Sequence, residues 1–331
     1  MKTITNMKRW ISVGLLLGLL CQFAHVDSVL CAEKTDPYAP YDNGVPEGYK
    51  LIEGDIIVPI VSVTGTFATN WWPNGVVPYE FNSNVSQENQ NRMLEAMSEW
   101  MAVANVHFQP RNGAASYLHI QNSTVNSSWV GKQGGGQVVN IHDWGWKFII
   151  AHELGHALGF WHEQSRPDRD SYVIIEWDRI PDDQEHNFER HGEACVYGTY
   201  DFDSVMHYGQ CAFSSCQNCD ADPDNCRTIT LRPPWYPTMQ TFIGQRDHLS
   251  SLDKITMSVM YPAYGTVFVN GAYAGVEHGT LLEPYRHFNT AASVVPVFGE
   301  IVIQPGSYPE TGVYTKNMVL KAPLGGVVIG E

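Results

Sequence analysis

The chain has 331 residues, 35 of them acidic and 20 basic, and a formal net charge of −15 at neutral pH. Hydrophobic residues make up 44% and charged residues 17%, a composition typical of globular proteins rather than disordered chains. The acidic balance argues against nucleic acid as a partner, because a polyanion binds to basic surfaces.

The first 32 residues have the layout of a secretory signal peptide. Lys2, Lys8 and Arg9 precede the apolar run WISVGLLLGLLCQFA, and a polar stretch follows it. The apolar core of about 15 residues is short for a membrane span, although a signal anchor is an alternative. We therefore expect residues 1–32 to be removed and the protein to be secreted, with no membrane span left.

The next segment, residues 33–62, is rich in Pro, Tyr, Gly and Asp. It shows little periodicity and no helix signal, so we expect an extended pro-segment or linker. A folded domain is expected over residues 63–262. Its first strand follows the Pro-Asn-Gly turn in NWWPNGVVPYEF.

A helix is predicted over residues 85–104. Asn84 is the expected N-cap, with Gln87 completing a capping box. Apolar residues recur at spacings of three and four, which predicts one buried face. These residues are Met93, Leu94, Met97, Trp100, Met101 and Ala104.

Strands are predicted at VHFQPR, SYLHIQ and QVVNIH, and a second helix covers the histidine-rich stretch AHELGHAL. The order of strand, helix, strands and helix predicts an α+β fold. The chain is then rich in loops up to a last helix in LSSLDKITMSVMYP, which Pro262 ends. Residues 265–331 form a separate segment with β-branched residues and frequent turns.

The stretch HELGHALGFWH has the spacing of a metal site. His152 and His156 lie four residues apart, on one face of a helix, and Glu153 lies about 100° further round. Gly159 permits a sharp exit from the helix, which can bring His162 to the same ion.

Three neutral imidazoles and an open position describe a catalytic zinc site. Zinc lowers the pKa of a bound water to roughly 7, and Glu153 is the expected general base for its attack on a peptide carbonyl. Histidines that cap or pack a helix are the alternative for HExxH alone. The longer pattern, with the glycine and the third histidine, meets more conditions and favours the metal site.

The stretch HELGHALGFWHEQSRPDRD resembles the astacin family of zinc metalloendopeptidases, within the metzincins, and so does YDFDSVMHYG. The similarity spans roughly residues 63–262. It implies a two-lobed zincin fold with the substrate cleft between the lobes. It also implies protein or peptide substrates and one catalytic zinc ion, held by His152, His156 and His162 with Glu153 as the base.

The resemblance assigns roles to three more residues. Met206 is the Met-turn methionine beneath the site, and Tyr208 is an additional zinc ligand that swings away and helps to stabilise the oxyanion. Glu163 is implied to anchor the mature N-terminus. The alternatives are a core methionine, a buried aromatic with a bonded hydroxyl and a solvent-exposed acid.

The stretch LIEGDIIVP resembles the inhibitory pro-segment of the family, which makes Asp55 the residue that binds zinc in place of water; a turn aspartate is the alternative. Gly54 lets the backbone pass close to the metal. The same resemblance puts the mature N-terminus near Val63. No Lys or Arg lies between Lys50 and Arg92, so we expect an activating protease that prefers apolar or small residues, the enzyme itself included.

The cysteines depart from the family pattern. Animal astacins carry disulfides that bridge the N-terminal lobe, but no cysteine lies between Cys31 and Cys195, which favours a bacterial type. In the exported chain we expect two disulfides and one leftover thiol, in any of fifteen arrangements; a structural zinc site is the alternative. The cysteines concerned are Cys195, Cys211, Cys216, Cys219 and Cys226.

The strand SYLHIQ lies where the family has an edge strand above the active site, so we expect substrate to pair with it. The end of the chain, from EIVIQPGSYPE onward, resembles one coil of a parallel β-helix. A solenoid needs about three coils to bury its core. Three roles are possible for this segment: a truncated relic, a cap on the domain, or a module for attachment to a surface.

The leading interpretation is a secreted zinc endopeptidase made as a zymogen. Another metzincin subgroup is a rival, which Tyr208 and the EGD pro-segment argue against. A rival of another class is a catalytically inert binding or adhesion protein, which Glu153 and the complete histidine set disfavour. Oligomeric state and the identity of the substrate are not readable from the sequence.

Overall fold

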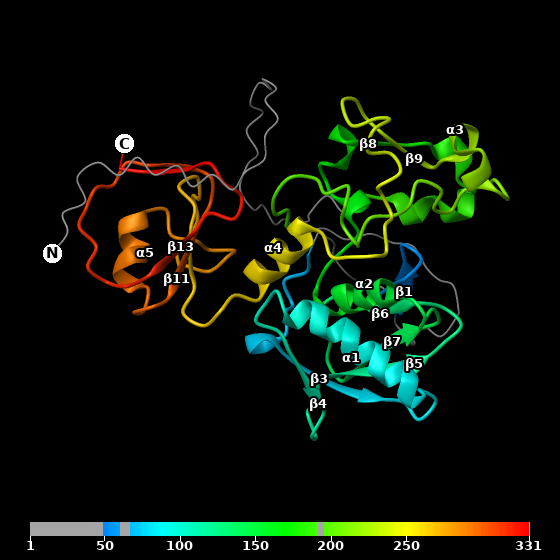
Figure 1. The fold of residues 1–331 in the computed structure, drawn as a ribbon, viewed down its shortest axis with the longest axis horizontal. Helices are drawn as coiled ribbons and strands as arrows, with labels where there is room; N and C mark the ends of the chain where they lie inside the picture. Colours follow the sequence, from blue (N-terminus) through cyan, green and yellow to red (C-terminus); the bar gives the residue numbers. More distant parts are fainter. Residues whose placement is uncertain (1–48, 60–66, 191–194, 331) are drawn as a thin grey trace. The chain divides into compact units, whose positions relative to one another are not determined.

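The structure is a computed structural model that describes residues 49–59, 67–190 and 195–330. The predicted signal peptide, most of the predicted pro-segment and the expected cleavage position at Val63 lie outside these residues. The described residues divide into two units, a larger one that ends at Tyr261 and a smaller one that begins at Pro262 (Figure 1). In the described parts, no helix is long and apolar enough to cross a membrane.

A seven-stranded sheet forms one layer of the larger unit, in the order β1-β2-β6-β7-β5-β3-β4. The predicted strands are confirmed as β3, β4, β5 and β7. The bounds are β1 Tyr49–Ile52, β2 Ile56–Pro59, β3 Val76–Phe81, β4 His107–Pro110, β5 Tyr117–Asn122, β6 Ser127–Trp129 and β7 Gly136–Ile141. Sheet residues such as Leu118, Ile120 and Val139 are fully buried.

Helices α1 (Gln87–Met101) and α2 (Lys147–Leu158) pack against each other beside this sheet. The Trp100 indole of α1 donates to the Ala151 carbonyl of α2, 2.9 Å away. The predicted helix over residues 85–104 is therefore present, and it is shorter at both ends.

Two details of the α1 prediction are wrong. The N-cap is Ser86, whose side chain accepts from the Asn89 amide, and no capping box involves Gln87. Asn84 instead bonds both main-chain groups of Asn122. The buried face consists of Met93, Ala96, Met97 and Trp100, whereas Leu94 and Met101 are each 43% exposed.

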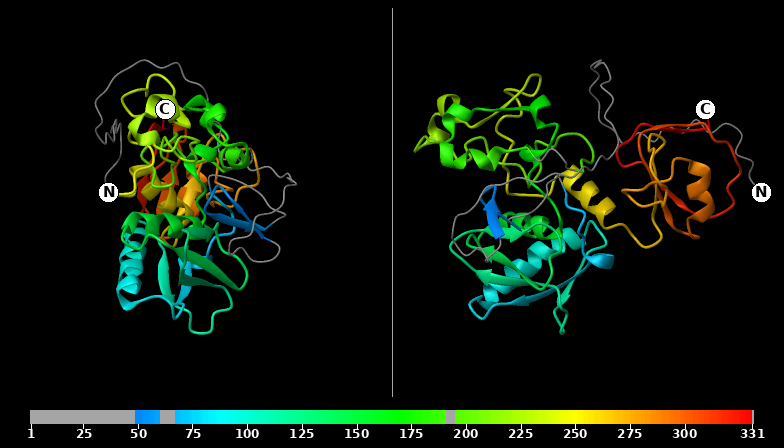
Figure 2. Two further views of the ribbon diagram at one scale, coloured as in Figure 1. Left: turned by 90° about the vertical axis from the view of Figure 1, so that its right-hand side faces the viewer. Right: turned by 180° about the vertical axis from the view of Figure 1, so that it is seen from behind.

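Residues 49–59 are the described part of the segment expected to be an extended pro-segment or linker, and they form two strands that the sequence pattern does not predict. Strands β1 and β2 form an antiparallel hairpin, and β2 pairs in parallel with β6, Ile56 opposite Ser128 and Ile57 opposite Trp129. The hairpin, blue in Figure 2, thus extends the sheet beyond β6. The short apolar stretch IIVP supplies a strand signal that the Pro- and Gly-rich composition around it hides.

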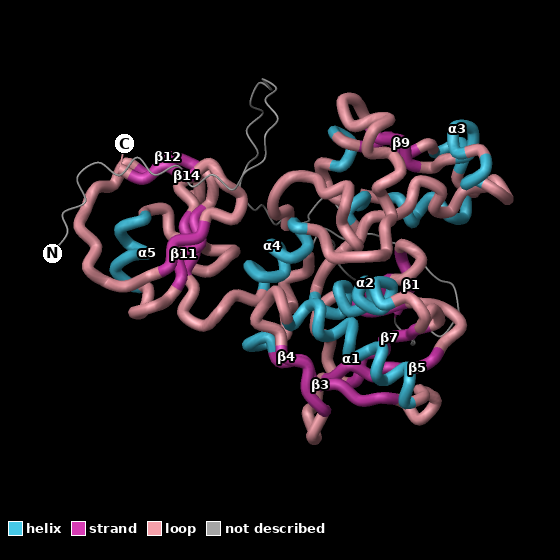
Figure 3. The backbone as a smooth tube through the Cα atoms, in the orientation of Figure 1, coloured by secondary structure: helices cyan, strands magenta, loops and turns pink. Residues whose placement is uncertain are grey.

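Most of the chain between α2 and α4 (Ser251–Met260) is loop (Figure 3). Its regular elements are the strand pair β8 (Val173–Ile175) and β9 (Ile229–Leu231) and the helix α3 (Pro223–Cys226). Short 3-10 helices are η1 Pro73–Gly75 before β3, then η2 Glu163–Ser165, η3 Arg169–Ser171, η4 Trp177–Arg179, η5 Asp182–Phe188 and η6 Cys219–Ala221.

Disulfides staple part of this irregular segment. Cys211 is bonded to Cys219, and Cys216 to Cys226. Cys195 is disulfide-bonded as well, so the prediction of a leftover thiol is wrong. The alternative of a structural zinc site on these cysteines is excluded, because a disulfide sulfur offers no thiolate.

The smaller unit has its own core around Val269, Phe288, Ile301 and Tyr308. Its strands pair in parallel: β11 lies between β10 and β13, and β12 pairs with β14. The Lys316 ammonium donates hydrogen bonds to three carbonyls at the end of α5. The bounds are β10 Val267–Val269, α5 Phe288–Val294, β11 Glu300–Ile303, β12 Gly306–Tyr308, β13 Val319–Lys321 and β14 Val327–Ile329. Parallel pairing is the type that a β-helix uses, but these short sheets do not establish one.

Candidate metal centre

Helix α2 carries the first two histidines and ends at the predicted glycine. Gly159 has a φ of +121°, a conformation that side chains disfavour, and its amide bonds back to the carbonyls of Gly155 and His156. The chain then leaves the helix, and His162 stands in extended conformation just before η2. The predicted sharp exit is what returns His162 to the helix.

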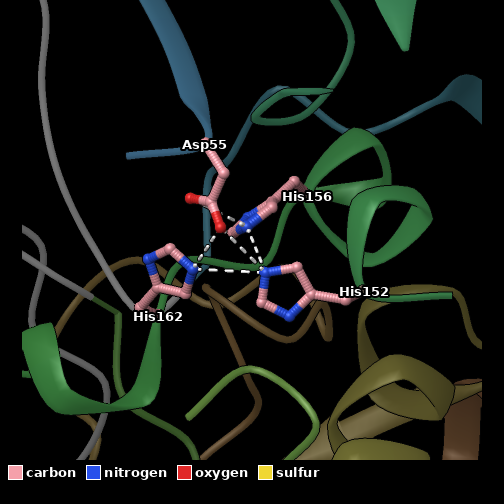
Figure 4. A group of neighbouring side chains, drawn as sticks. All are labelled: Asp55, His152, His156 and His162. Atoms are coloured by element: carbon pink, nitrogen blue, oxygen red, sulfur yellow. Dashed lines mark hydrogen bonds and ion pairs between the residues drawn. The ribbon is translucent and has the colours of Figure 1, made fainter. Parts of the chain in front are cut away.

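Four side chains converge on one point (Figure 4). The Nε2 atom of His152 lies 3.1 Å from that of His156 and 3.3 Å from that of His162. The Asp55 Oδ2 atom lies 3.3 Å from the Nε2 atoms of both His152 and His162. Possible ligand atoms of all four residues lie within 4.8 Å of one another.

The hydrogen bonds of the three imidazoles involve the Nδ1 atoms, so the Nε2 lone pairs are available to bind a cation. Each Nδ1 atom faces an oxygen that can only accept a hydrogen bond. His152 Nδ1 lies 2.8 Å from the Val205 carbonyl, and His156 Nδ1 lies 2.8 Å from the Phe160 carbonyl. His162 Nδ1 lies 2.5 Å from the Glu53 carboxylate. The Nδ1 atoms are therefore the donors, and three Nε2 lone pairs face each other. A tetrahedral zinc ion fits this donor set.

Glu153 lies beside the metal position without joining its ligands. It is 1% exposed, and its Oε2 atom has no hydrogen-bond partner among the described residues. Burial and the negative charge of Asp55 raise the pKa of Glu153 well above its ordinary value. A buried carboxylate oxygen that no described residue bonds is available to accept a proton.

Met206 packs against α2 at Gly155. A Cβ added to Gly155 would lie 2.9 Å from the Met206 sulfur, so only glycine allows this approach. The turn around Met206 is held from α4, where the Asp253 carboxylate accepts from the Val205 amide at 2.9 Å and the Ser204 hydroxyl at 2.7 Å. Asp253 also forms a capping box with Ser250 at the start of α4.

Tyr208 lies against the third histidine, with ring centroids 4.6 Å apart. Its hydroxyl donates to the Glu53 carbonyl, and its amide donates to the Gln164 side chain at 3.0 Å. The Phe213 ring covers it from the disulfide-stapled segment, at 5.6 Å. In this state Tyr208 is held by the hairpin.

Glu163 lines a small buried cavity. Its Oε1 atom accepts from the Arg166 guanidinium at 3.0 Å and from the Asp201 amide at 2.7 Å. Burial raises its pKa to about 8, against the lowering effect of Arg166. The cavity of about 20 Å³, which Asp201 and Asp253 also line, has room for roughly one water.

Two residues that the sequence does not single out act on the site. Glu53 forms hydrogen bonds with His162 and Tyr208. Nothing in the sequence EGD, residues 53–55, indicates a role for this glutamate apart from that of Asp55. Arg246 donates to the His207 carbonyl at 3.1 Å, and its positive charge acts on Asp55 and Glu153. No spacing rule connects Arg246 to the histidine motif.

The expectation that SYLHIQ is the edge strand is wrong. Strand β5 lies between β7 and β3, so both of its edges are already paired. Strand β6 is the one whose outer edge the hairpin covers. A strand of only three residues carries too little alternation to be recognised from sequence, which is why the pattern favours the longer β5.

The comparisons with known proteins agree with this geometry. The model of the astacin peptidase family matches residues 65–262. The chain is 33% identical to the low choriolytic enzyme of Oryzias latipes over 223 residues, which are 64% of this chain and 78% of that protein. It is 32% identical to meprin A subunit alpha of Mus musculus, over 78% of this chain and 35% of that protein.

Among solved structures, high choriolytic enzyme 1, a hatching enzyme zinc-protease from Oryzias latipes, matches with a TM-score of 0.52 and 33% identity. The match covers 58% of this chain and 94% of that one, and it supports the α+β zincin-like fold. These relatives are animal proteins, so they give no support to the expected bacterial type. The chain spans about a third of the length of the meprin subunit.

Proposed function

This chain belongs to the astacin family of zinc metalloendopeptidases, and we propose that it is secreted as a zymogen whose pro-segment, residues 33–62, closes the catalytic centre with its described part, residues 49–59. The observation that carries the proposal is the position of Asp55. Its carboxylate points at the Nε2 atoms of three histidines, where a water would otherwise stand (Figure 4).

His152, His156 and His162 would hold the catalytic zinc. When bound, zinc polarises the peptide carbonyl and lowers the pKa of a water to roughly 7. Glu153 takes the proton of the attacking water and passes it to the leaving amine. Its buried position and its Oε2 atom, which no described residue bonds, support this role.

Tyr208 would complete the mature site. Once the hairpin leaves, its hydroxyl loses the Glu53 carbonyl and is free to turn toward the metal or toward the oxyanion that forms during attack. The Tyr208 ring next to His162 supports both positions. Met206 remains the apolar floor.

Substrate would take the place of β2 on the edge of β6. The hairpin already pairs there through main-chain hydrogen bonds, which accept any extended peptide regardless of its sequence. Side-chain pockets then supply selectivity. We therefore propose Ser127–Trp129, rather than β5, as the strand that binds extended substrates.

Activation would release the hairpin by a cut near Val63. The new N-terminal ammonium is expected to reach Glu163, where Asp201 and Asp253 add negative charge around the same cavity. The absence of Lys and Arg between Lys50 and Arg92 supports an activator other than a trypsin-like protease. N-terminal sequencing of the active form tests this, and a final cut after Lys50 would refute it.

Export is supported by the two disulfides of the stapled segment, because disulfides persist in oxidising compartments. The basic start and short apolar core of residues 1–32 support a cleaved signal peptide.

Casein hydrolysis by the processed protein tests the activity. We expect the wild type to cleave casein and a chelator to stop it, while Glu153→Ala binds one zinc and is inactive. If both proteins hold zinc and neither cleaves after complete processing, the proposed activity is refuted. For the zymogen, an Asp55→Ala precursor is expected to cleave without processing, and a fully silent one counts against the switch.

A further inference from the structure

The three predicted zinc ligands differ in what holds their second nitrogen. The Nδ1 atoms of His152 and His156 donate to main-chain carbonyls of the catalytic domain. The Nδ1 atom of His162 donates to the carboxylate of Glu53, which belongs to the pro-segment hairpin. Two ligands are therefore oriented by the domain itself, and the third by a segment that activation removes.

We propose that Glu53 is a positioning residue for His162, so that the pro-segment strengthens the hold on zinc as well as covering it. The inference rests on the proposed zymogen function of residues 49–59. It assigns a second task to the hairpin, separate from the blocking carboxylate of Asp55.

The contact has the character of a strong, oriented bond. Glu53 is 1% exposed and His162 is fully buried, and the Nδ1 to Oε2 distance is 2.5 Å. A hydrogen bond to a charged acceptor is shorter and stronger than one to a neutral carbonyl. A carboxylate on the far nitrogen also fixes the tautomer and makes the ligating nitrogen more basic.

The turn of the hairpin explains how one short segment reaches both sides of this imidazole. Glu53 has a φ of +51° and Gly54 of +79°, so the chain reverses tightly between Glu53 and Asp55. A Cβ on Gly54 would lie 2.6 Å from the Phe213 ring, which shows how closely the turn packs against the disulfide-bonded segment. Asp55 then faces Nε2 of His162, while Glu53 faces Nδ1.

The same residue also holds the neighbouring tyrosine. The main-chain carbonyl of Glu53 accepts from the Tyr208 hydroxyl, while its side chain accepts from His162. Glu53 thereby contacts both His162 and Tyr208, which lie in the loop-rich part of the chain after α2. Removal of the hairpin releases both at once, and we expect zinc to exchange faster in the mature enzyme than in the precursor.

The test measures zinc loss from the full-length precursor. A Glu153→Gln background prevents self-processing, and the zinc-loaded protein is mixed with excess EDTA while bound zinc is followed over time. We expect Glu53→Gln to lose zinc about 10- to 100-fold faster, the usual effect of removing a partner of a metal-ligating histidine. Equal rates in parent and variant would overturn the inference.

A matched control comes from another carboxylate–imidazole pair. Glu80 on β3 bonds Nδ1 of His119 at 2.9 Å, in a partly exposed place apart from the metal ligands. Glu80→Gln makes the same chemical change there and is expected to alter the rate of zinc loss by less than about twofold, because no metal ligand depends on it. A rate change as large as that of Glu53→Gln would show that the assay reports general destabilisation and would overturn the assignment.

Asp55→Asn in the same background separates the two proposals. If it speeds zinc loss and Glu53→Gln does not, the zymogen proposal stands and the role of Glu53 is refuted. If neither changes the rate, both are refuted.

A peptide assay removes any dependence on folding of the variant precursor. Peptides of residues 49–59, with and without Glu53→Gln, are added to the mature enzyme as inhibitors. We expect inhibition to weaken by about tenfold or more with the substitution, because a charge-assisted hydrogen bond is lost. Equal inhibition overturns the inference.

Discussion

Residues 67–158 and residues 159–250 each supply part of the metal centre, but they hold it by different means. In the first region the main-chain hydrogen bonds of a sheet and two helices fix His152, Glu153 and His156. In the second region, regular structure is scarce, and hydrogen bonds from individual buried side chains hold the residues of the site in position. The Gln164 side chain positions the Tyr208 amide, for example.

The two kinds of support predict different sensitivity to substitution. A helix distributes its stability over many equivalent hydrogen bonds, so one exposed change costs little. A turn held by a single carboxylate loses its position when that carboxylate goes, because the buried donors are left without an acceptor. Substitutions in both regions test this contrast.

Glu153→Gln should have the largest effect. The substitution removes the general base and keeps the shape of the side chain, so we expect kcat/KM for peptide hydrolysis to fall about 10³- to 10⁴-fold. Zinc content, measured by atomic absorption, should be unchanged, because α2 still presents both of its histidines. If the variant loses its zinc, the positions of His152 and His156 on α2 depend on the Glu153 side chain, contrary to the prediction.

Asp253→Ala tests the irregular region. It removes the acceptor of the Val205 amide and the Ser204 hydroxyl together with half of the capping box of α4. We expect the free energy of unfolding to fall by about 3 kcal/mol, the range for breaking a buried polar network.

The control for Asp253→Ala is Glu95→Ala, an exposed acid on α1. Its effect on the free energy of unfolding should stay within about 0.5 kcal/mol. Denaturant unfolding measures both variants, and equal effects would remove the contrast between the two regions.

The double substitution Cys216→Ser and Cys226→Ser tests how much the irregular region depends on its staples. The bond closes a loop with a sequence separation of 10, and loop-closure entropy predicts a loss of about 2–3 kcal/mol. Thermal unfolding under non-reducing conditions gives the result. An unchanged melting temperature would mean that packing alone holds this segment.

Leu94→Gln should have the smallest effect. Leu94 is 43% exposed on α1, so we expect a change below about 0.5 kcal/mol in the free energy of unfolding. The matched substitution Met97→Ala, about one turn further on and 1% exposed, should cost about 2–5 kcal/mol. If Leu94→Gln costs as much as Met97→Ala, Leu94 belongs to the buried face, as the sequence pattern predicts, and the observed exposure of Leu94 does not decide its contribution.

The same contrast explains what the sequence can reveal. Strands β3, β5 and β7 and helix α1 carry periodic apolar residues, α2 carries the histidine motif, and the predicted ranges lie close to the observed bounds. The convergence of His152, His156 and His162 also follows from spacing, since helical geometry and a glycine exit are local properties.

What the sequence does not reveal depends on contacts between distant segments. Glu53 meets His162 across 109 positions, and Arg246 acts on Glu153 from beyond the stapled segment. No local pattern marks such pairs. Strand β6 escapes prediction for a related reason, because three residues become a strand only when β7 and β2 flank them.

The pairing of β2 with β6 has a consequence for handling and storage of the protein. When the hairpin departs, main-chain donors and acceptors of β6 lose their partners and form an open sheet edge. Open edges are templates on which further chains assemble. Concentrated mature enzyme should therefore self-associate more readily than the precursor, and a tight-binding peptide inhibitor should keep it monodisperse.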